Sequence, residues 1–337
     1  MKKAFKVFSI VLRVALGLAL LYYILSTTGD WHSLYALLDR WWLLVAVPAL
    51  PFFGALLECI RLRLLFLAQG IHYTHTRLYK LIAVGSFYNN AMPGGVGGDL
   101  VKLYYLAVET RGRTVETATI LAVDRAVALF SWLLVIVVLG VLNASRLATH
   151  VPVLLMTASA FGLMTVLGLL ALLSGSTALR STRLFTYLTT RAPLHRPIHR
   201  IADALYTYRD QRHVLLQAAL WSLPGHLATC AMYWAVASVL IPQAPGLLVC
   251  LLAFLGMLAN VLPVTPGGLG VGEAAFHGLF SMFGYAGGAQ LILAWRVAML
   301  PFGILGGILY MIGVREKRQA AEEVDLTLEK KWAPGNA

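Results

Sequence analysis

Charge is what this sequence lacks most. Charged residues make up 12% of its 337 residues, about half the share in an average soluble domain, whereas hydrophobic residues make up 59%. A chain of this length cannot bury so much apolar surface inside one compact core. The composition therefore excludes an ordinary soluble domain and predicts an integral membrane protein whose solvent is lipid.

Cysteine and nucleotide-binding motifs are also scarce or missing. The three cysteines, Cys59, Cys230 and Cys250, stand singly in apolar stretches and have no C-x-x-C spacing, which excludes a zinc ribbon and a disulfide framework. The glycine-rich stretches lack the Gly-Lys-[Ser/Thr] of a P-loop and the G-x-G-x-x-G of a dinucleotide site. We accordingly expect no cofactor and no metal.

The few charges are mostly positive, with 27 Lys and Arg against 15 Asp and Glu, which gives a net charge of +12. In a soluble protein this excess would suggest nucleic acid, but no recognition motif for DNA or RNA is present. In a membrane protein it indicates basic cytoplasmic loops that face anionic headgroups. The expected partners are therefore anionic membrane lipids, and nothing in the sequence specifies an oligomeric state.

Six stretches reach the length of about 20 mostly apolar residues that a membrane span needs. They are residues 5–28, 41–68, 118–142, 152–174, 214–240 and 289–313, the second of which carries Glu58 and Arg61 near its end. Lysines precede the first span, seven arginines occupy loop 175–213, and basic residues follow the last span. Because positive residues mark the cytoplasmic side, both termini and loop 175–213 are predicted to be cytoplasmic.

Two further apolar regions, 81–108 and 246–283, are broken by glycine and proline. The charge pattern requires the first to enter and leave on the cytoplasmic face and the second to enter and leave on the outer face. Both are therefore predicted to be re-entrant hairpins of broken helices that dip from opposite sides. This arrangement is an inverted repeat, with repeat one at about 41–142 and repeat two at about 214–313.

The two broken regions contain the same motif, which supports the duplication independently. They read YNNAMPGGVGGDLVK and ANVLPVTPGGLGVGEAAF, and both contain Asn-x-x-Pro and a Pro-Gly-Gly run that ends at an acid. Proline ends a helix, and glycine permits positive φ or close backbone approach. The candidate residues are Asn90, Pro93, Gly94, Gly95, Gly97, Gly98 and Asp99 in the first elbow, and Asn260, Pro263, Gly267, Gly268, Gly270, Gly272 and Glu273 in the second.

Ionisable residues at membrane depth form the second set of candidates, because such residues are costly unless they have a function. Each elbow has an acid and each following span an arginine, which pairs Asp99 with Arg125 and Glu273 with Arg296. Further candidates are Lys102 on the Asp99 face, Asp124 as an alternative partner of Arg125, and His277 one turn after Glu273. Two interpretations remain open: the pairs pin each elbow to its neighbouring helix, or the cations hold an anionic headgroup.

The segments FYNNAMPGGVGGDLVKLYYL, AVDRAVAL, NVLPVTPGGLGVGEAAF and AWRVAML resemble the lysylphosphatidylglycerol synthase transmembrane-region family, also described as flippase-like. That family includes the membrane half of the multiple peptide resistance factor, and the resemblance spans about residues 5–314. It implies a protein of a bacterial or archaeal plasma membrane that moves lipids between leaflets or supports enzymes that build modified lipids. Lys102 departs from the family pattern, since relatives commonly have arginine there.

The chain ends at Ala337 without the soluble aminoacyl-transferase domain of the full synthases, so we expect no lysyl-lipid synthesis and no enzymatic activity. The predicted fold is an all-α polytopic membrane domain, residues 1–320, with a cytoplasmic tail at 321–337. The predicted function is lipid transport between the two elbows. The alternatives are an accessory subunit of a lipid-modifying enzyme and an intramembrane enzyme, for which Glu273 and His277 offer only a weak acid–base pair.

Overall fold

A computed structural model describes residues 39–91, 97–110, 113–174, 206–259, 265 and 268–332, and all regular structure within these residues is helical. Five of the described helices are long and apolar enough to cross a membrane. They are α3 (Trp41–Ala68), α6 (Thr114–Leu142), α8 (Val151–Ser174), α12 (Arg212–Leu240) and α15 (Gly288–Trp332). The predicted all-α membrane fold and five of its six spans are thereby confirmed, and the span 5–28 lies outside the described residues.

The outer surfaces of the long helices are apolar, as lipid requires. Trp41, Val115, Val141 and Leu216 each expose more than half of their surface, and many other large hydrophobic side chains point outward. A soluble protein rarely shows so much contiguous apolar surface. Because a helix satisfies its own backbone hydrogen bonds, these spans need no water along their length.

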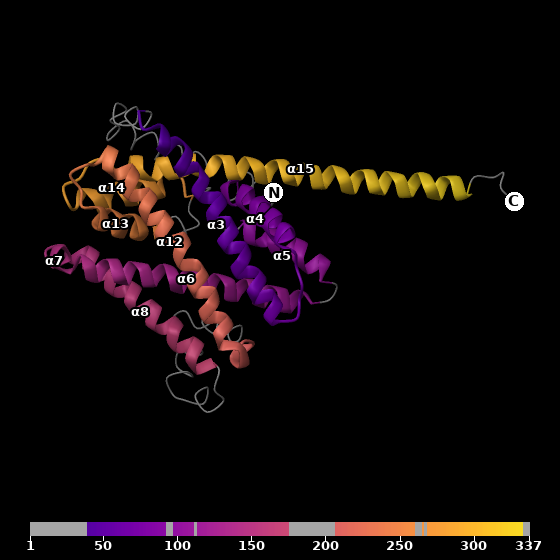
Figure 1. Ribbon diagram of the computed structural model, residues 1–337, viewed down its shortest axis with the longest axis horizontal. Helices are drawn as coiled ribbons and strands as arrows, with labels where there is room; N and C mark the ends of the chain where they lie inside the picture. Colours follow the sequence, from indigo (N-terminus) through magenta and orange to yellow (C-terminus); the bar gives the residue numbers. More distant parts are fainter. Residues whose placement is uncertain are drawn as a thin grey trace, which may run out of the picture.

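Between the long helices lie two hairpins of short helices. The first is α4 (His75–Ala91) with α5 (Gly97–Glu109), and the second is α13 (Gly246–Ala259) with α14 (Val271–Ser281). Figure 1 shows the two hairpins at opposite ends of the bundle. The sequence prediction that broken helices occupy 81–108 and 246–283 therefore agrees with the observed elements.

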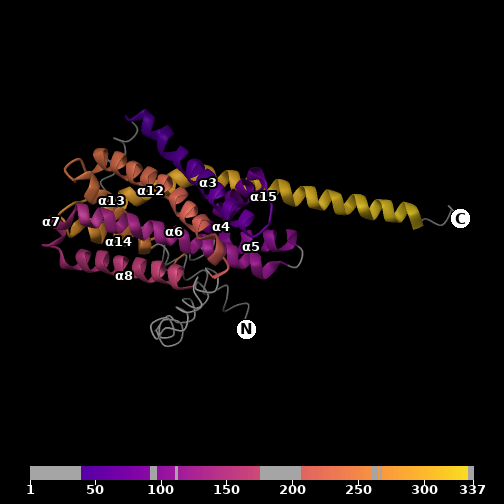
Figure 2. The same ribbon diagram turned by 60° about the horizontal axis from the view of Figure 1, so that its bottom comes forward.

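The two halves of the chain have the same pattern of contacts between helices. Helix α3 packs against α12, α6 packs against α12 and α13, and α15 packs against α3 and α4. Replacing each helix by its counterpart (α3 by α12, α4 by α13, α5 by α14, α6 by α15) reproduces the same set of neighbours. In Figure 1, α3 and α12 run side by side in opposite directions. Helices α7 (Ala144–Leu147) and α8 stand outside this scheme, and α8 packs against α6, as Figure 2 shows.

Glycines allow the first hairpin to pack unusually closely. A Cβ added to Gly98 of α5 would lie 2.2 Å from the Gly85 oxygen of α4, and a Cβ added to Gly306 of α15 would lie 1.9 Å from the Ala83 oxygen. Small residues of this kind let helices approach in a membrane, where packing rather than the hydrophobic effect drives association. The glycines thus hold α4 tightly between α5 and α15.

Candidate functional site

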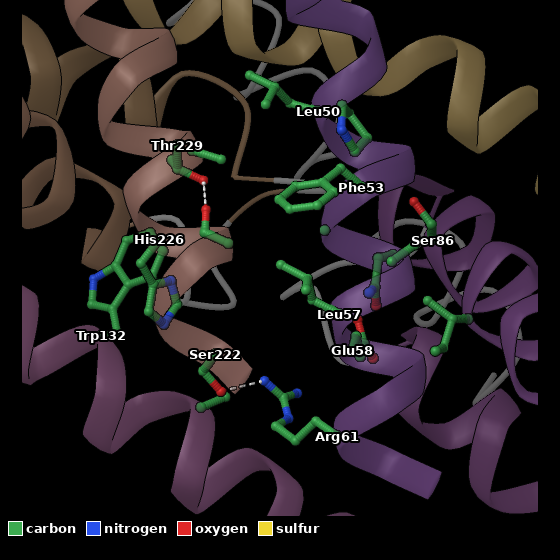
Figure 3. A pocket seen from close by; sticks show the side chains of 18 of the residues that line it. Leu50, Phe53, Leu57, Glu58, Arg61, Ser86, Trp132, Ser222, His226 and Thr229 are labelled. Carbon is green, nitrogen blue, oxygen red and sulfur yellow. Dashed lines mark hydrogen bonds between the residues drawn. The ribbon is translucent and has the colours of Figure 1, made fainter. Parts of the chain in front are cut away.

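A cavity of about 730 Å³ lies inside the bundle, between α3 and α12 and bordered by both hairpins and by α6 and α15. Its walls are largely apolar and aromatic, including Phe53, Trp132, Trp221 and Trp295. Charged and polar side chains gather at one end, where Glu58 and Arg61 of α3 face Ser222 of α12 across the cavity (Figure 3). The cavity is therefore amphipathic.

Asp99, Lys102 and Arg125 lie together at this charged end. Arg125 of α6 donates a hydrogen bond through Nη2 to Asp99 Oδ1, and Lys102 Nζ lies 3.0 Å from the same oxygen. Lys102 Nζ also donates to Glu58 Oε1 at 2.8 Å. The predicted pairing of Asp99 with Arg125 is thus observed, and Lys102 does lie on the Asp99 face of its helix.

Asp124 has a different partner from the one considered from the sequence. It does not pair with its neighbour Arg125; Arg61 binds it with two parallel bonds, Nε to Oδ1 at 2.7 Å and Nη2 to Oδ2 at 3.0 Å. Arg61 Nη1 also donates to Ser222 Oγ at 3.0 Å. Because adjacent residues point to different faces of a helix, Asp124 faces α3 while Arg125 faces α5.

Glu58 and Arg61 are functional candidates that the sequence argument missed. Both lie on α3, three residues apart and hence on one face, and both line the cavity. Their signal was available, since charged residues inside an apolar span are rare and usually paired. Their position near the end of the span hides this signal, because charged side chains there commonly reach the membrane interface.

The charged end is electrically balanced within the described residues, with three acids (Glu58, Asp99 and Asp124) and three bases (Arg61, Lys102 and Arg125). The members differ in access. The Arg125 side chain is 48% exposed, whereas Asp124 is 2% exposed and Lys102 is buried. Pairing lowers the free-energy cost of burying a charge, and both side chains of the Arg61–Asp124 pair are accordingly buried. Arg125 is the cation best placed to meet a ligand.

The predicted pair of the second elbow, Glu273 with Arg296, is observed and is largely buried. Arg296 of α15 donates from Nε to Glu273 Oε1 at 2.6 Å and from Nη2 to the Gly268 oxygen at 2.9 Å. Glu273 is fully buried and accepts the Gly270 amide at 2.7 Å, which caps the start of α14. Gly268 and Gly270 have φ of +69° and +79°, so the prediction that elbow glycines adopt positive φ is confirmed at these positions.

The remaining predicted site residues are placed as follows. Gly97, Gly98 and Gly272 are buried at the starts of α5 and α14, and His277 is half-buried on α14. Asn89, which was not among the predicted residues, accepts the Gly98 amide at 2.7 Å through Oδ1. The Asn90 side chain and residues Pro93, Gly94, Gly95, Asn260, Pro263 and Gly267 lie outside the description. No cluster of potential metal ligands is found among the described residues.

A second hollow of about 690 Å³ lies between α6, α8, α13 and α14. Its walls are apolar except for Ser159, whose hydroxyl donates to the Leu155 oxygen of its own helix. Leu258 lines both this hollow and the central cavity, so the two are neighbours across α13. The charged cavity is therefore bordered by a mostly apolar hollow.

Fold and site together define a multi-pass α-helical membrane protein with a charged internal cavity. Within that class, the chain belongs to the family described as "Lysylphosphatidylglycerol synthase TM region", which it matches over residues 10–307. The resemblance stated from the motifs is thereby confirmed over most of the chain.

One curated relative is a "UPF0104 membrane protein" of Methanothermobacter thermautotrophicus. The two proteins are 25% identical over 264 residues, which cover 69% of this chain and 74% of the relative. No solved structure matches the chain. The relative's name states a membrane location and no activity, so the argument for function rests on the family and on the geometry of the site.

Proposed function

We propose that this protein moves a phospholipid or an isoprenoid-phosphate-type lipid between leaflets, with the headgroup passing through the central cavity. The observation that carries the proposal is Arg125, a half-exposed arginine in a mostly apolar cavity, paired with the partly exposed carboxylate of Asp99. An arginine in this setting binds phosphate through its planar fork. A helix with only a structural role would gain nothing from such an arginine, because an ionisable group inside the membrane has a high free-energy cost.

Competition between ligand and carboxylate lets the site release what it binds. An entering phosphate displaces Asp99 from Arg125, and Asp99 keeps a cationic partner in Lys102, which lies 3.0 Å away. When the headgroup leaves, the original pair re-forms. In both states each carboxylate contacts a cation, with Lys102 shared between Asp99 and Glu58 when the phosphate is bound, which lowers the free energy of entry and exit.

The duplicated packing supports an inverted repeat as the basis of this movement. Helices that are counterparts in sequence order also have counterpart neighbours, and α3 and α12 run in opposite directions. In the proposed arrangement, the hairpin α4–α5 enters from the cytoplasmic face and the hairpin α13–α14 from the outer face. Such repeats place a substrate site near the bilayer midplane and expose it to each side in turn.

The proposed orientation has both termini and loop 175–213 on the cytoplasmic side of a bacterial or archaeal plasma membrane, and loops 29–40, 143–151 and 284–288 outside. It rests on the arginines of loop 175–213 and the basic residues after the last span. Labelling of single cysteines placed in 284–288 checks it. Labelling from the cytoplasmic side only would mean that 246–283 crosses the membrane, which contradicts the opposed hairpins.

Reconstitution of the purified protein into liposomes tests the transport function. We expect lipids labelled on an acyl chain to reach the opposite leaflet faster in these vesicles than in protein-free vesicles, as measured by quenching of the outer label. Vesicles containing the variant Arg125→Gln provide the matched control. If wild-type protein of proven fold moves no lipid of either class, the accessory-subunit alternative replaces transport.

A further inference from the structure

The wall of the cavity that α12 provides carries a column of polar side chains. Ser222, His226 and Thr229 are spaced four and three residues apart, so they share one face of the helix. Figure 3 shows His226 between Ser222 and Thr229 along α12, beside Trp132 and facing the space in front of α3. The column leads from the charged end, where Ser222 accepts a hydrogen bond from Arg61, toward the apolar part of the cavity.

His226 differs from the other two members in its hydrogen bonding. The Ser222 hydroxyl donates to the Ala218 oxygen and the Thr229 hydroxyl donates to the Gly225 oxygen, so both groups are satisfied within α12. The Nε2 atom of His226 is buried and has no hydrogen-bond partner within the described residues. Buried polar atoms are rarely left in this state, because the loss of hydrogen bonds to water is not compensated.

The chemical role of this nitrogen follows from the other side of the ring. His226 has a hydrogen bond with the backbone oxygen of Ala128 on α6. Because Nε2 has no hydrogen-bond partner among the described residues, we assign this bond to Nδ1, and with it the proton of the neutral imidazole. With this assignment Nε2 is left as a buried hydrogen-bond acceptor on a side chain that lines the cavity.

Packing alone does not account for a histidine at this position. The ring lies edge-on to Trp132, with centroids 5.3 Å apart, and edge-on to Phe254 at 6.1 Å. A phenylalanine would make the same aromatic contacts without burying an unsatisfied nitrogen. The acceptor is thus the property that distinguishes histidine from the residue that packing would favour.

We propose that His226 Nε2 accepts a hydrogen bond from an N–H or O–H group of the lipid headgroup and so determines headgroup specificity. The inference rests on the proposed function only in that a headgroup enters this cavity. Headgroups that carry a donor, such as ethanolamine or glycerol, satisfy Nε2. A choline headgroup has no N–H or O–H and leaves this nitrogen buried and unpaired.

A binding series on the wild-type protein tests this specificity. Phosphatidylethanolamine and its mono-, di- and trimethylated forms, all with identical acyl chains, are added to the full chain in detergent, and binding is measured by native mass spectrometry. We expect affinity to change little while one N–H remains and to fall about fivefold at the third methyl group, where the last donor is lost. A gradual decline along the series indicates selection by size alone and overturns the proposal.

The variant His226→Phe provides the second arm. It keeps the aromatic contacts, and we expect it to bind the ethanolamine and choline forms with equal affinity. Thr229→Val is the matched control, since it removes a hydroxyl of the same cavity wall that is already satisfied within α12. If His226→Phe still binds the ethanolamine form five times more tightly than the choline form, Nε2 does not have this role. If the variant unfolds, the methylation series on the wild-type protein decides the question.

Binding and transport are measured on the same preparations, so that the two proposals fail separately. A preference for donors without any lipid movement in liposomes would remove transport and leave the headgroup site in place. Lipid movement with no preference for donors, in both the binding and the liposome assays, would remove the role of His226 and leave transport in place.

Discussion

The two elbows use the same acid–arginine pair in opposite ways. In the first, the Asp99–Arg125 pair borders the cavity and shares a network with Lys102 and Glu58. In the second, Glu273 is fully buried, held by Arg296 and by the Gly270 amide. A carboxylate with partners on every side is a structural pin, whereas one that shares an exposed arginine can yield it to a ligand. In this conformation one copy of the duplicated motif therefore has its acid–arginine pair at the cavity (the open elbow), and the other copy has its pair largely buried (the closed elbow).

The largest expected effect comes from breaking the closed pair. Glu273→Gln leaves Arg296 without its carboxylate in a largely buried position, and we expect the free energy of unfolding to fall by about 3–5 kcal/mol. Thermal unfolding in detergent measures this loss. The matched change in the open elbow, Asp99→Asn, should cost about 1 kcal/mol or less, because Arg125 is half-exposed. Equal losses in the two variants would mean that the elbows do not differ in this way.

The next effect concerns transport through the open site. Arg125→Gln removes the cation that we propose meets the phosphate, and we expect lipid movement in liposomes to slow about tenfold or more while thermal stability stays near that of the wild type. Arg125→Lys should restore the rate only in part, because lysine keeps the charge and loses the planar fork. If the glutamine variant unfolds and its folded remainder transports normally, Arg125 is a second structural pin.

The smallest effect is expected at the turn of the closed elbow. Gly268 has φ of +69°, a conformation that costs a side chain about 1–2 kcal/mol, so Gly268→Ala should lower stability by that amount. Gly278→Ala is the control, because Gly278 lies within α14 and an added Cβ there meets no atom within 4 Å. That change should be neutral or slightly stabilising. Similar melting temperatures for both variants would show that the turn relaxes around the new side chain.

Local patterns determined much of the fold. Hydropathy placed a span at 41–68, which are the bounds of α3, and it placed three other spans within a few residues of α6, α8 and α12. The span predicted at 289–313 matches the apolar part of α15, which begins at Gly288 and continues as a helix to Trp332. The repeated glycine-proline motif located both hairpins and both acid–arginine pairs. These features depend on residues close in sequence, or on a duplication that the sequence itself displays, and for that reason they were predictable.

Tertiary packing decided which charges meet across the bundle. The pairs Arg61–Asp124 and Lys102–Glu58 join residues 63 and 44 positions apart, and they form only because α3 presents that face to α5 and α6. That an intramembrane charge needs a partner follows from the low dielectric of lipid, so pairing as such was evident from the sequence. The choice of partner depends on how each helix is rotated and crossed, and a list of residues does not contain that information. The sequence also does not show that His226 Nε2 lacks a hydrogen-bond partner among the described residues. Only the packing of α12 against α6 buries this nitrogen beside the cavity.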